Sequence, residues 1–289
     1  MSWRTVIISN RCKLDLSVGY MVVRGEDTKR IFLEEIAVLL IENPAVSMTG
    51  CLLSELAKQK IRVIFCDEKR NPYAELQPYN ACHDSSGKIR TQIAWAESRK
   101  KTVWTEIVTE KIRNQARLLG ELGFESESAM LSGYAADVTH GDLTNREGHA
   151  AKVYFNALFG KSFSRGQENP VNAALNYGYS LLLSAFNREV SLNGYLAQLG
   201  ICHDNAGNPY NLSCDLMEPF RPVIDRVVYN MNPVFFEKEE KICLVSLLHE
   251  SFMISGSIQT LLNAVKIYTK SIFDAINDND LSEVKFIKI

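Results

Sequence analysis

The sequence lacks the cysteine spacing that would hold a structural zinc ion or a disulfide framework. Its seven cysteines are an odd number, lie far apart and include no Cys-x-x-Cys pair. Reduced and mostly buried thiols are therefore expected. Long apolar stretches are also missing, since none approaches the ~20 residues that span a bilayer. No hydrophobic region of a secretory signal follows Met1. We expect a cytoplasmic protein that does not bind membranes.

Common catalytic signatures and an excess of positive charge are missing as well. No HExxH, Walker A, GxGxxG or GxSxG pattern occurs. The 32 basic residues face 34 acidic ones, giving a net charge of −2, whereas proteins that bind nucleic acids are often more basic. Any surface for nucleic acid must therefore be local. Residues 88–117, with eight basic and three acidic side chains, are one candidate.

The composition that is present is that of an ordinary globular protein. The chain has 289 residues, 46% hydrophobic and 23% charged, which suggests one large domain or two ordinary ones. In the N-terminal part, short apolar or alternating runs between turn formers predict strands. These expected strands are Trp3–Ile8, Lys13–Val18, Tyr20–Val23, Arg30–Phe32, Ala37–Ile41 and Arg62–Cys66. One helix interrupts them, capped by Ser47 or Thr49.

Turn formers over Tyr73–Gly87 mark the expected boundary, and helical periodicity dominates after it. Helical patterns run over residues 172–199 and 244–276, the second broken at Ser255–Gly256. The tail after Asn277 is either a frayed end or a docking strand.

Strands first and helices later predict an α+β fold with segregated parts. We expect a strand-rich scaffold domain over residues 1–80 and a larger helical domain over residues 81–289, which holds the side chains that could carry chemistry.

Glu147 lies near the start of an expected helix that Asp142 or Thr144 can cap. Ala150 and Tyr154 fall on or near the same helix face, so the carboxylate stands beside an apolar stripe. Such a carboxylate needs a partner, which can be a metal, an arginine or a hydroxyl. The alternative is a first-turn glutamate favoured by the helix dipole.

His203 lies in a polar segment that ends the long helical pattern, a common way of presenting an imidazole to a ligand. Taken alone, a surface histidine is the simpler interpretation. The neighbouring Cys202 is not a candidate nucleophile, because adjacent side chains seldom point at each other.

Asp215 and Glu218 are three residues apart, so a helical turn would let their carboxylates converge. Pro219 and Pro222 place Glu218 close to a helix start, and Arg221 could brace it. The alternative is an acidic cap with a weak surface salt bridge.

Together, Glu147, His203 and Glu218 supply two carboxylates and an imidazole. That set suits a divalent cation, either Mg²⁺ or Mn²⁺.

Three segments carry a resemblance to a known family. They are Arg146–Ala151 (Arg-Glu-Gly-His-Ala-Ala), Asn172–Leu182 and, most specific, Asp215–Pro222 (Asp-Leu-Met-Glu-Pro-Phe-Arg-Pro). With a strand-rich region before them, they make the whole chain resemble the CRISPR-associated integrase and endonuclease subunit of spacer acquisition. The pattern is similar to the type II-A branch of that family.

The resemblance implies a β-sandwich-like N-terminal domain for dimerisation and an all-α catalytic C-terminal domain. It implies a homodimer around a small second CRISPR-associated subunit, with double-stranded DNA and other type II-A CRISPR proteins as further partners. The family's metal ligands map onto Glu147, His203 and Glu218, and Asp215 matches a second acidic position. The implied activity, part of CRISPR adaptation in antiviral defence, joins the 3′-hydroxyl of a short DNA fragment to a phosphodiester at the repeat boundary.

Further residues are weighed between supporting roles and ordinary surface positions. Those that could orient ligands or phosphates are Asn145, Arg146, Asn176 and Arg221. Those that could follow a DNA backbone are Arg90, Arg99, Lys100 and Lys101, although a solvated helix face is the commoner outcome. Core packing is expected for Trp95 and Trp104 rather than base stacking.

Three rival functions remain at this point. A metal-dependent nuclease or branched-DNA resolvase would use the same ligands with water as the nucleophile. A non-catalytic scaffold would tolerate changes at Glu147 or His203. A small-molecule metalloenzyme would enclose the three ligands in a pocket instead of an open groove.

Overall fold

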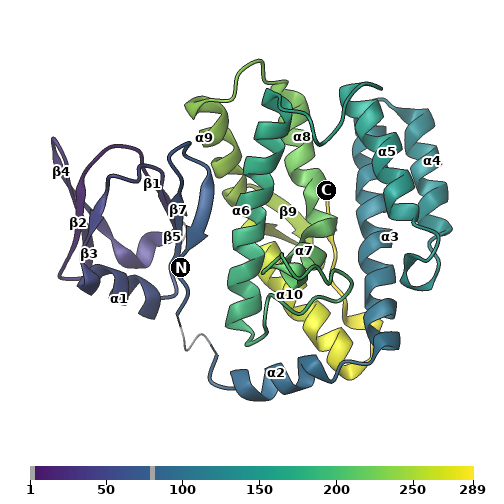
Figure 1. The fold of residues 1–289 in the computed structure, drawn as a ribbon, viewed down its shortest axis with the longest axis horizontal. Coiled ribbons are helices and arrows are strands. Elements are labelled where there is room, and N and C mark those ends of the chain that lie inside the picture. The colour runs from purple at the N-terminus through teal and green to yellow at the C-terminus, as the bar shows by residue number, and fades with distance from the viewer. Residues whose placement is uncertain (1–3, 79–81) are drawn as a thin grey trace. The chain divides into compact units, whose positions relative to one another are not determined.

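Residues 4–78 and 82–289 are described by a computed structural model, in which the chain divides between His83 and Asp84 into two units (Figure 1). The boundary expected after residue 80 and the first residue of the expected first strand, Trp3, lie outside the described residues. Each unit is considered by itself below.

The first unit contains two four-stranded sheets. Its strands are β1 (Arg4–Ile8), β2 (Lys13–Ser17), β3 (Tyr20–Arg24), β4 (Thr28–Phe32), β5 (Ile36–Ile41), β6 (Ser47–Met48), β7 (Arg62–Cys66) and β8 (Pro72–Glu75). One sheet has the order β1-β5-β7-β8 and the other the order β4-β3-β2-β6. In the first sheet β1, β5 and β7 run parallel, whereas β2, β3 and β4 of the second form an antiparallel meander.

The two sheets and the helix α1 (Gly50–Lys58) share one hydrophobic core. It contains Leu14 and Leu39, one from each sheet, together with Leu52 of α1. Thr49 caps α1 by accepting a hydrogen bond from the Leu52 amide at 3.3 Å, one of the two expected caps. The β-sandwich-like character expected of this region is therefore confirmed.

The second unit is mainly helical. Its α-helices are α2 (Ser85–Ile93), α3 (Glu97–Glu121), α4 (Glu125–Ala136), α5 (Arg146–Phe159), α6 (Pro170–Leu192), α7 (Asn211–Met217), α8 (Arg221–Met231), α9 (Lys238–Ser246) and α10 (Leu261–Asp278). The long α3 packs against α4, α5, α8 and α10, and α6 packs against α7, α8, α9 and α10 (Figure 1). The α+β class is confirmed, and no helix among the described residues is long and apolar enough to span a membrane.

The expectation of an all-α second domain is wrong in one respect. β9 (Ser251–Ile254), β10 (Ser257–Thr260) and β11 (Ile287–Lys288) form a small antiparallel sheet in the order β10-β9-β11. Ser255 and Gly256, both at positive φ (51° and 74°), make the two-residue turn that joins β9 to β10. The stretch expected to be one broken helix is thus two helices separated by a hairpin, because short apolar runs fit either periodicity. The C-terminal tail is a docking strand.

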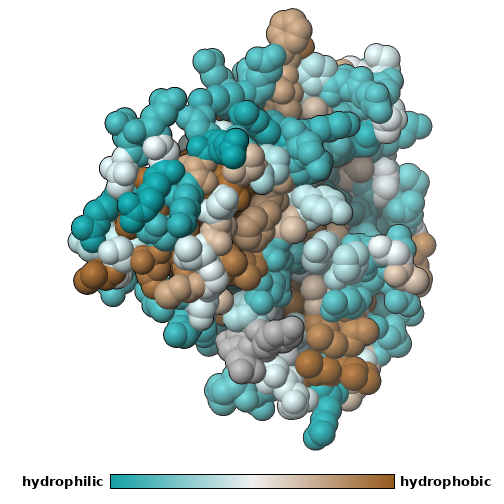
Figure 2. Space-filling view, turned by 60° about the vertical axis from the view of Figure 1, so that its left-hand side comes forward, coloured by the Kyte–Doolittle hydropathy of each residue, from teal (hydrophilic) through white to brown (hydrophobic). Residues whose placement is uncertain are grey.

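The cysteine side chains are less buried than expected, whereas the two tryptophan side chains are buried as expected. Each cysteine among the described residues is free, but Cys51, Cys202 and Cys243 are exposed, so the thiols are not mostly buried. Trp95 and Trp104 belong to the core, as expected, at 7% and 4% exposure. Figure 2 shows a largely hydrophilic surface on which apolar residues form separate patches.

Gly178 in α6 provides a test of how closely α6 packs on α8. A Cβ atom at this position would lie 2.4 Å from Ile224 Cγ2, so one of the two helices must shift to accept it. Gly178→Ala should therefore destabilise the protein by about 1–3 kcal/mol. At the exposed Gly133 in α4 a Cβ would meet nothing within 4 Å. Gly133→Ala, the matched control, should stabilise by about 0.5–1 kcal/mol.

Chemical denaturation of the two variants and the wild type measures both effects. Equal stabilities of the Gly178 and Gly133 variants would contradict this account of the packing between α6 and α8.

Candidate active site

The start of α5 fixes the backbone that carries Glu147. Asn145, at a positive φ of 51°, is the N-cap and accepts a hydrogen bond from the Gly148 amide at 3.2 Å. The Asp142 carboxylate accepts hydrogen bonds from the two amides that precede Gly148, those of Arg146 at 2.8 Å and Glu147 at 3.0 Å. The cap is thus Asn145 instead of Asp142 or Thr144, with Asp142 as a second acceptor. The first-turn amides are satisfied by these neighbours, which leaves the Glu147 side chain for another partner.

Glu218 lies in a 3-10 turn (Glu218–Phe220) between α7 and α8, and its side chain is 4% exposed. Arg221 Nε donates to Glu218 Oε1 at 2.9 Å, which confirms the expected brace. Burial opposes ionisation of this carboxyl, but Arg221 and Lys111 outweigh it and lower the pKa of Glu218 to about 2. The side chain is therefore a buried carboxylate at neutral pH.

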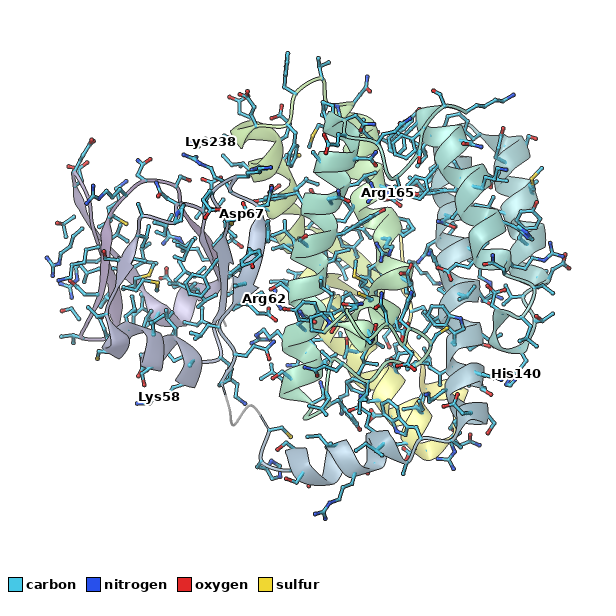
Figure 3. All side chains as sticks on the ribbon, viewed as in Figure 1. Lys58, Arg62, Asp67, His140, Arg165 and Lys238 are labelled. Atoms are coloured by element: carbon cyan, nitrogen blue, oxygen red, sulfur yellow. The ribbon has the colours of Figure 1, made fainter. Side chains whose placement is uncertain are left out.

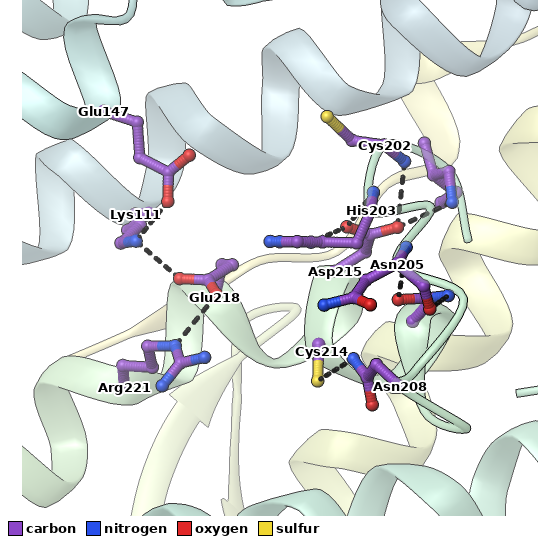
Figure 4. Close-up of polar contacts among 12 residues, drawn as sticks. Lys111, Glu147, Cys202, His203, Asn205, Asn208, Cys214, Asp215, Glu218 and Arg221 are labelled. Atoms are coloured by element: carbon purple, nitrogen blue, oxygen red, sulfur yellow. Dashed lines mark hydrogen bonds and ion pairs between the residues drawn. The ribbon is translucent and has the colours of Figure 1, made fainter. Parts of the chain in front are cut away.

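Lys111 of α3 lies between the two glutamates. Its Nζ atom is 2.5 Å from Glu147 Oε1 and 2.5 Å from Glu218 Oε2, and its side chain is 9% exposed (Figure 4). Burial alone would lower the pKa of Lys111, but the Glu218 and Glu147 carboxylates outweigh it and raise that pKa. The Glu147 carboxylate thus has a charged partner, but it is a lysine and not the metal, arginine or hydroxyl that was expected.

Asp215 organises the loop that carries His203. Its fully buried carboxylate accepts backbone amides from Ile201 at 2.6 Å, Cys202 at 2.9 Å and His203 at 3.2 Å. The same group lies 2.5 Å from His203 Nδ1. A Cβ atom on Gly200 would lie 2.1 Å from the His203 carbonyl oxygen, so only glycine fits there.

The bond to Asp215 fixes how the imidazole of His203 is presented. An Nδ1–H that donates to a carboxylate leaves Nε2 as the free nitrogen for a ligand. The edge of Trp104 packs against the ring, with centroids 5.8 Å apart, and the side chain points toward Glu218 (Figure 4). The hydrogen bond to Asp215 raises the pKa of His203 against the opposing effect of burial, and the Glu218 and Glu147 carboxylates add to the rise.

Asp215 and Glu218 do not converge, contrary to expectation. Asp215 faces the loop before α7, whereas Glu218 faces Lys111 and Arg221. The spacing argument fails because different partners hold the two carboxylates: three backbone amides of the loop before α7 hold Asp215, and the side chains of Lys111 and Arg221 hold Glu218.

Glu147, His203 and Glu218 share one neighbourhood, but Lys111 separates the two carboxylates. Over residues 4–78 and 82–289, no three His, Cys, Asp or Glu side chains lie at distances that would hold a metal ion. The donor set nevertheless fits a Mg²⁺ or Mn²⁺ ion, since a cation already bridges the two carboxylates. Glu218 Oε2 is buried and lies 2.5 Å from the Lys111 ammonium, so this oxygen already faces a cation.

The supporting residues expected from the sequence have other partners. Asn145 is a helix cap, and Arg146 forms an ion pair with Asp137 at 3.5 Å. Asn176 accepts a hydrogen bond from Arg165 at 2.6 Å. Two of the expected supporting residues contact a candidate ligand: Arg221 pairs with Glu218, and Asp215 holds His203.

The basic residues singled out in the sequence lie on α2 and the first turn of α3. Arg90, Arg99 and Lys101 are exposed, and Arg99 donates to the Asn277 carbonyl at 3.1 Å. Lys100 pairs with Glu97 at 2.7 Å. Their contact with DNA stays a prediction.

A second buried network behind Glu218 was not predicted. The guanidinium carbons of Arg221 and Arg165 lie 4.6 Å and 5.3 Å from the centre of the Tyr179 ring. Tyr179 and Tyr154 both donate to the Asp225 carboxylate, at 2.5 Å and 2.9 Å, and burial raises the pKa of Asp225 to about 6. Arg165, labelled in Figure 3, thus contacts the same tyrosine ring as the guanidinium that holds Glu218.

Lys111 could have been found from the sequence by its position in α3. The apolar residues Val103, Ile107 and Leu118 recur at helical spacing, and Lys111 occupies the next position of that stripe. A lysine on a buried face requires an acidic partner, although the sequence does not identify it.

Solved structures of similar fold cover nearly the whole chain. A CAS1 protein from Thermotoga maritima superposes with a TM-score of 0.77 at 17% identity over 94% of this chain and 97% of that one. A casposase bound to its integration product gives a TM-score of 0.77 at 14% identity over 96% of this chain and 91% of that one. A chain of a Cas6-RT-Cas1–Cas2 complex gives 0.73 at 18% identity, over 97% of this chain and 35% of that one. The chain therefore has the two-part α+β fold of these proteins.

Sequence similarity identifies the family within that fold. The family described as CRISPR associated protein Cas1 matches residues 5–245. The CRISPR-associated endonuclease Cas1 of Neisseria meningitidis serogroup C (strain 8013) is 35% identical over 295 residues, which cover 100% of this chain and 97% of that protein. The chain belongs to the Cas1 family.

The raised pKa of His203 generates a prediction about Asp215. Asp215→Asn removes the carboxylate, so the pKa of His203 should fall toward its ordinary value of 6.5. The pairing stabilises the fold fully below about pH 6.5, and this contribution is lost as pH rises through the folded-state pKa of His203.

NMR titration of the histidines in EDTA, with His203→Gln to assign the signal, measures the shift. Asp204→Asn at the exposed neighbouring acid is the control and should leave the pKa of His203 nearly unchanged. An unaltered pKa in Asp215→Asn would contradict the pairing.

Proposed function

We propose that this chain is a metal-dependent DNA endonuclease and integrase of CRISPR adaptation. It would insert short foreign DNA fragments into a CRISPR array by transesterification of a DNA 3′-hydroxyl onto a phosphodiester at the repeat boundary. One observation carries the proposal. Glu147 and Glu218, far apart in the sequence, both bind the ammonium of Lys111 at a place beside His203. Membership of the Cas1 family supports it.

Glu147, His203 and Glu218 would hold a Mg²⁺ or Mn²⁺ ion. When bound, that ion supplies charge stabilisation for the phosphodiester and for the oxygen that leaves it. The DNA 3′-hydroxyl is the nucleophile, so no covalent bond to the protein is required. In agreement with this, burial and the Asp215 carboxylate raise the pKa of the nearby Cys202 to about 11, so its thiol stays protonated at neutral pH.

Residues next to the three ligands do the positioning. Asp215 holds the His203 loop and orients the imidazole, and Arg221 keeps Glu218 ionised in a buried place. Asp142 fixes the first turn of α5 below Glu147. Prealigned groups of this kind give much of the rate gain in phosphoryl transfer, because they align the nucleophile and stabilise developing charge without reorganisation.

The partners and location expected of this chain belong to the same proposal. Double-stranded DNA is the expected substrate, with the exposed Arg90, Arg99 and Lys101 following its backbone. A homodimer around a small Cas2 subunit is expected, and one structural neighbour is a Cas6-RT-Cas1–Cas2 complex. The type II-A assignment and its other CRISPR proteins rest on the Asp215–Pro222 motif, and a cytoplasmic location stays a prediction.

A plain nuclease or branched-DNA resolvase is the rival function, using water in place of the 3′-hydroxyl. The two differ in their products, because integration leaves fragment strands joined to the repeat whereas hydrolysis leaves only cut ends. The likeness to the fold of a casposase bound to its integration product favours testing joining first.

Glu218→Gln should abolish strand joining while the protein stays folded. Loss of a metal ligand removes several kcal/mol of charge stabilisation, so the joining rate should fall at least about 100-fold. The assay uses purified protein, its small partner subunit and a labelled repeat substrate. Glu125→Gln, at an exposed position of α4, is the matched control and should join strands normally.

Metal removal tests the same proposal independently. EDTA should stop joining by the wild type, and added Mn²⁺ should restore it. Joining by Glu218→Gln at the wild-type rate, or full activity in EDTA, would rule out the proposed metal chemistry.

A further inference from the structure

Lys111 makes contacts that the proposed chemistry does not use. Its ammonium bridges Glu147 Oε1 and Glu218 Oε2, the oxygens that face each other across the site (Figure 4). The lysine comes from α3, whereas the two acids come from α5 and from the turn before α8. A cation supplied by the chain itself therefore lies between two of the three groups that would hold the metal.

Charge counting shows what this arrangement does to a divalent ion. Glu147 and Glu218 carry two negative charges, and Lys111 and Arg221 carry two positive charges, so these four groups together are neutral. An ion bound beside both carboxylates would stand within a few ångströms of the ammonium. Like charges at that distance repel strongly where water is largely excluded. The ion and the Lys111 ammonium are thus alternative occupants.

The two cations of the cluster are not equally able to leave. Arg221 binds the other oxygen of Glu218 and is held against the Tyr179 ring. Among residues 4–78 and 82–289, no aromatic ring stacks on the Lys111 ammonium, which ends a flexible four-carbon stem. Moving its ammonium would free one oxygen of Glu147 and one of Glu218 at the same time. Glu218 Oε2 would exchange its ion pair with Lys111, now at 2.5 Å, for contact with the divalent ion.

We propose that Lys111 is a resident counter-cation that competes with the divalent metal for Glu147 and Glu218. The free protein then binds metal weakly, and the ammonium must move away before the two carboxylates can become ligands. A DNA phosphate beside the site would favour that exchange, because it offers the released ammonium a new partner. This inference rests on the proposed function, since it assumes that the two glutamates are metal ligands.

The test measures Mn²⁺ binding to the full chain without DNA, by isothermal titration calorimetry. Lys111→Met keeps the length of the side chain and removes its charge, so Mn²⁺ should bind at least about tenfold more tightly than to the wild type. Lys111→Arg keeps the charge and should bind Mn²⁺ as weakly as the wild type. Lys270→Met, on the exposed face of α10, is the matched control and should not change the affinity.

Thermal unfolding gives a second measurement that does not depend on activity. Without metal, Lys111→Met should melt at a lower temperature than the wild type, because its two carboxylates lose their shared partner. Added Mn²⁺ should then raise its melting temperature by more than it raises that of the wild type, since tighter binding to the folded state stabilises it more.

Two outcomes separate the inference from the proposed function. Equal or weaker Mn²⁺ binding by a folded Lys111→Met, with wild-type binding that is lost in Glu218→Gln, would overturn the competition and leave the metal site in place. Mn²⁺ binding that Glu218→Gln does not weaken would remove the metal site itself, and the inference with it.

Discussion

The Lys111 ammonium shared by Glu147 and Glu218 is the contact on which the geometry of the candidate site depends. Three charged groups with side chains 9%, 25% and 4% exposed must satisfy one another, because an unpaired charge in such a place is strongly unfavourable. Their pairing ties α3 to α5 and to the turn before α8. Asn114 strengthens the tie by donating to the Pro219 carbonyl at 2.8 Å. The two carboxylates need a positive charge between them, and this need both holds the elements together and creates a binding place for a cation.

Two acidic residues three positions apart have opposite tasks in this arrangement. The carboxylate oxygens of Asp215 accept hydrogen bonds from backbone amides and from His203, so this residue fixes the conformation of the loop. The buried Glu218 carboxylate pairs with the two cations Lys111 and Arg221, so it is suited to bind a positive ion. Their partners separate the two roles, because backbone amides hold Asp215 whereas a lysine and an arginine hold Glu218. A histidine and a glutamate from distant segments are thereby presented to the same space.

The fold is retained where sequence similarity is low. Solved neighbours at 14–18% identity still cover at least 94% of this chain. Burial explains this, because a strand such as β5, with Val38 to Ile41 buried, needs apolar side chains but no particular ones. The Glu218–Arg221 brace and the Asp215–His203 pair depend on specific atoms. The site, unlike the core, requires particular residues.

Local pattern by itself determined six of the eight strands described in the first unit, the Thr49 cap and the Arg221 brace, since each depends on neighbours within a few residues. The short strands β6 and β8 were missed. Core packing was also expected for Trp95 and Trp104, whose large apolar rings favour burial. The β9–β10 hairpin was missed, because short apolar runs satisfy both periodicities. Only the tertiary structure gave Glu147 a lysine partner and His203 an aspartate partner. Those contacts join segments distant in the chain, and long-range pairing of charges leaves no periodic trace in a sequence.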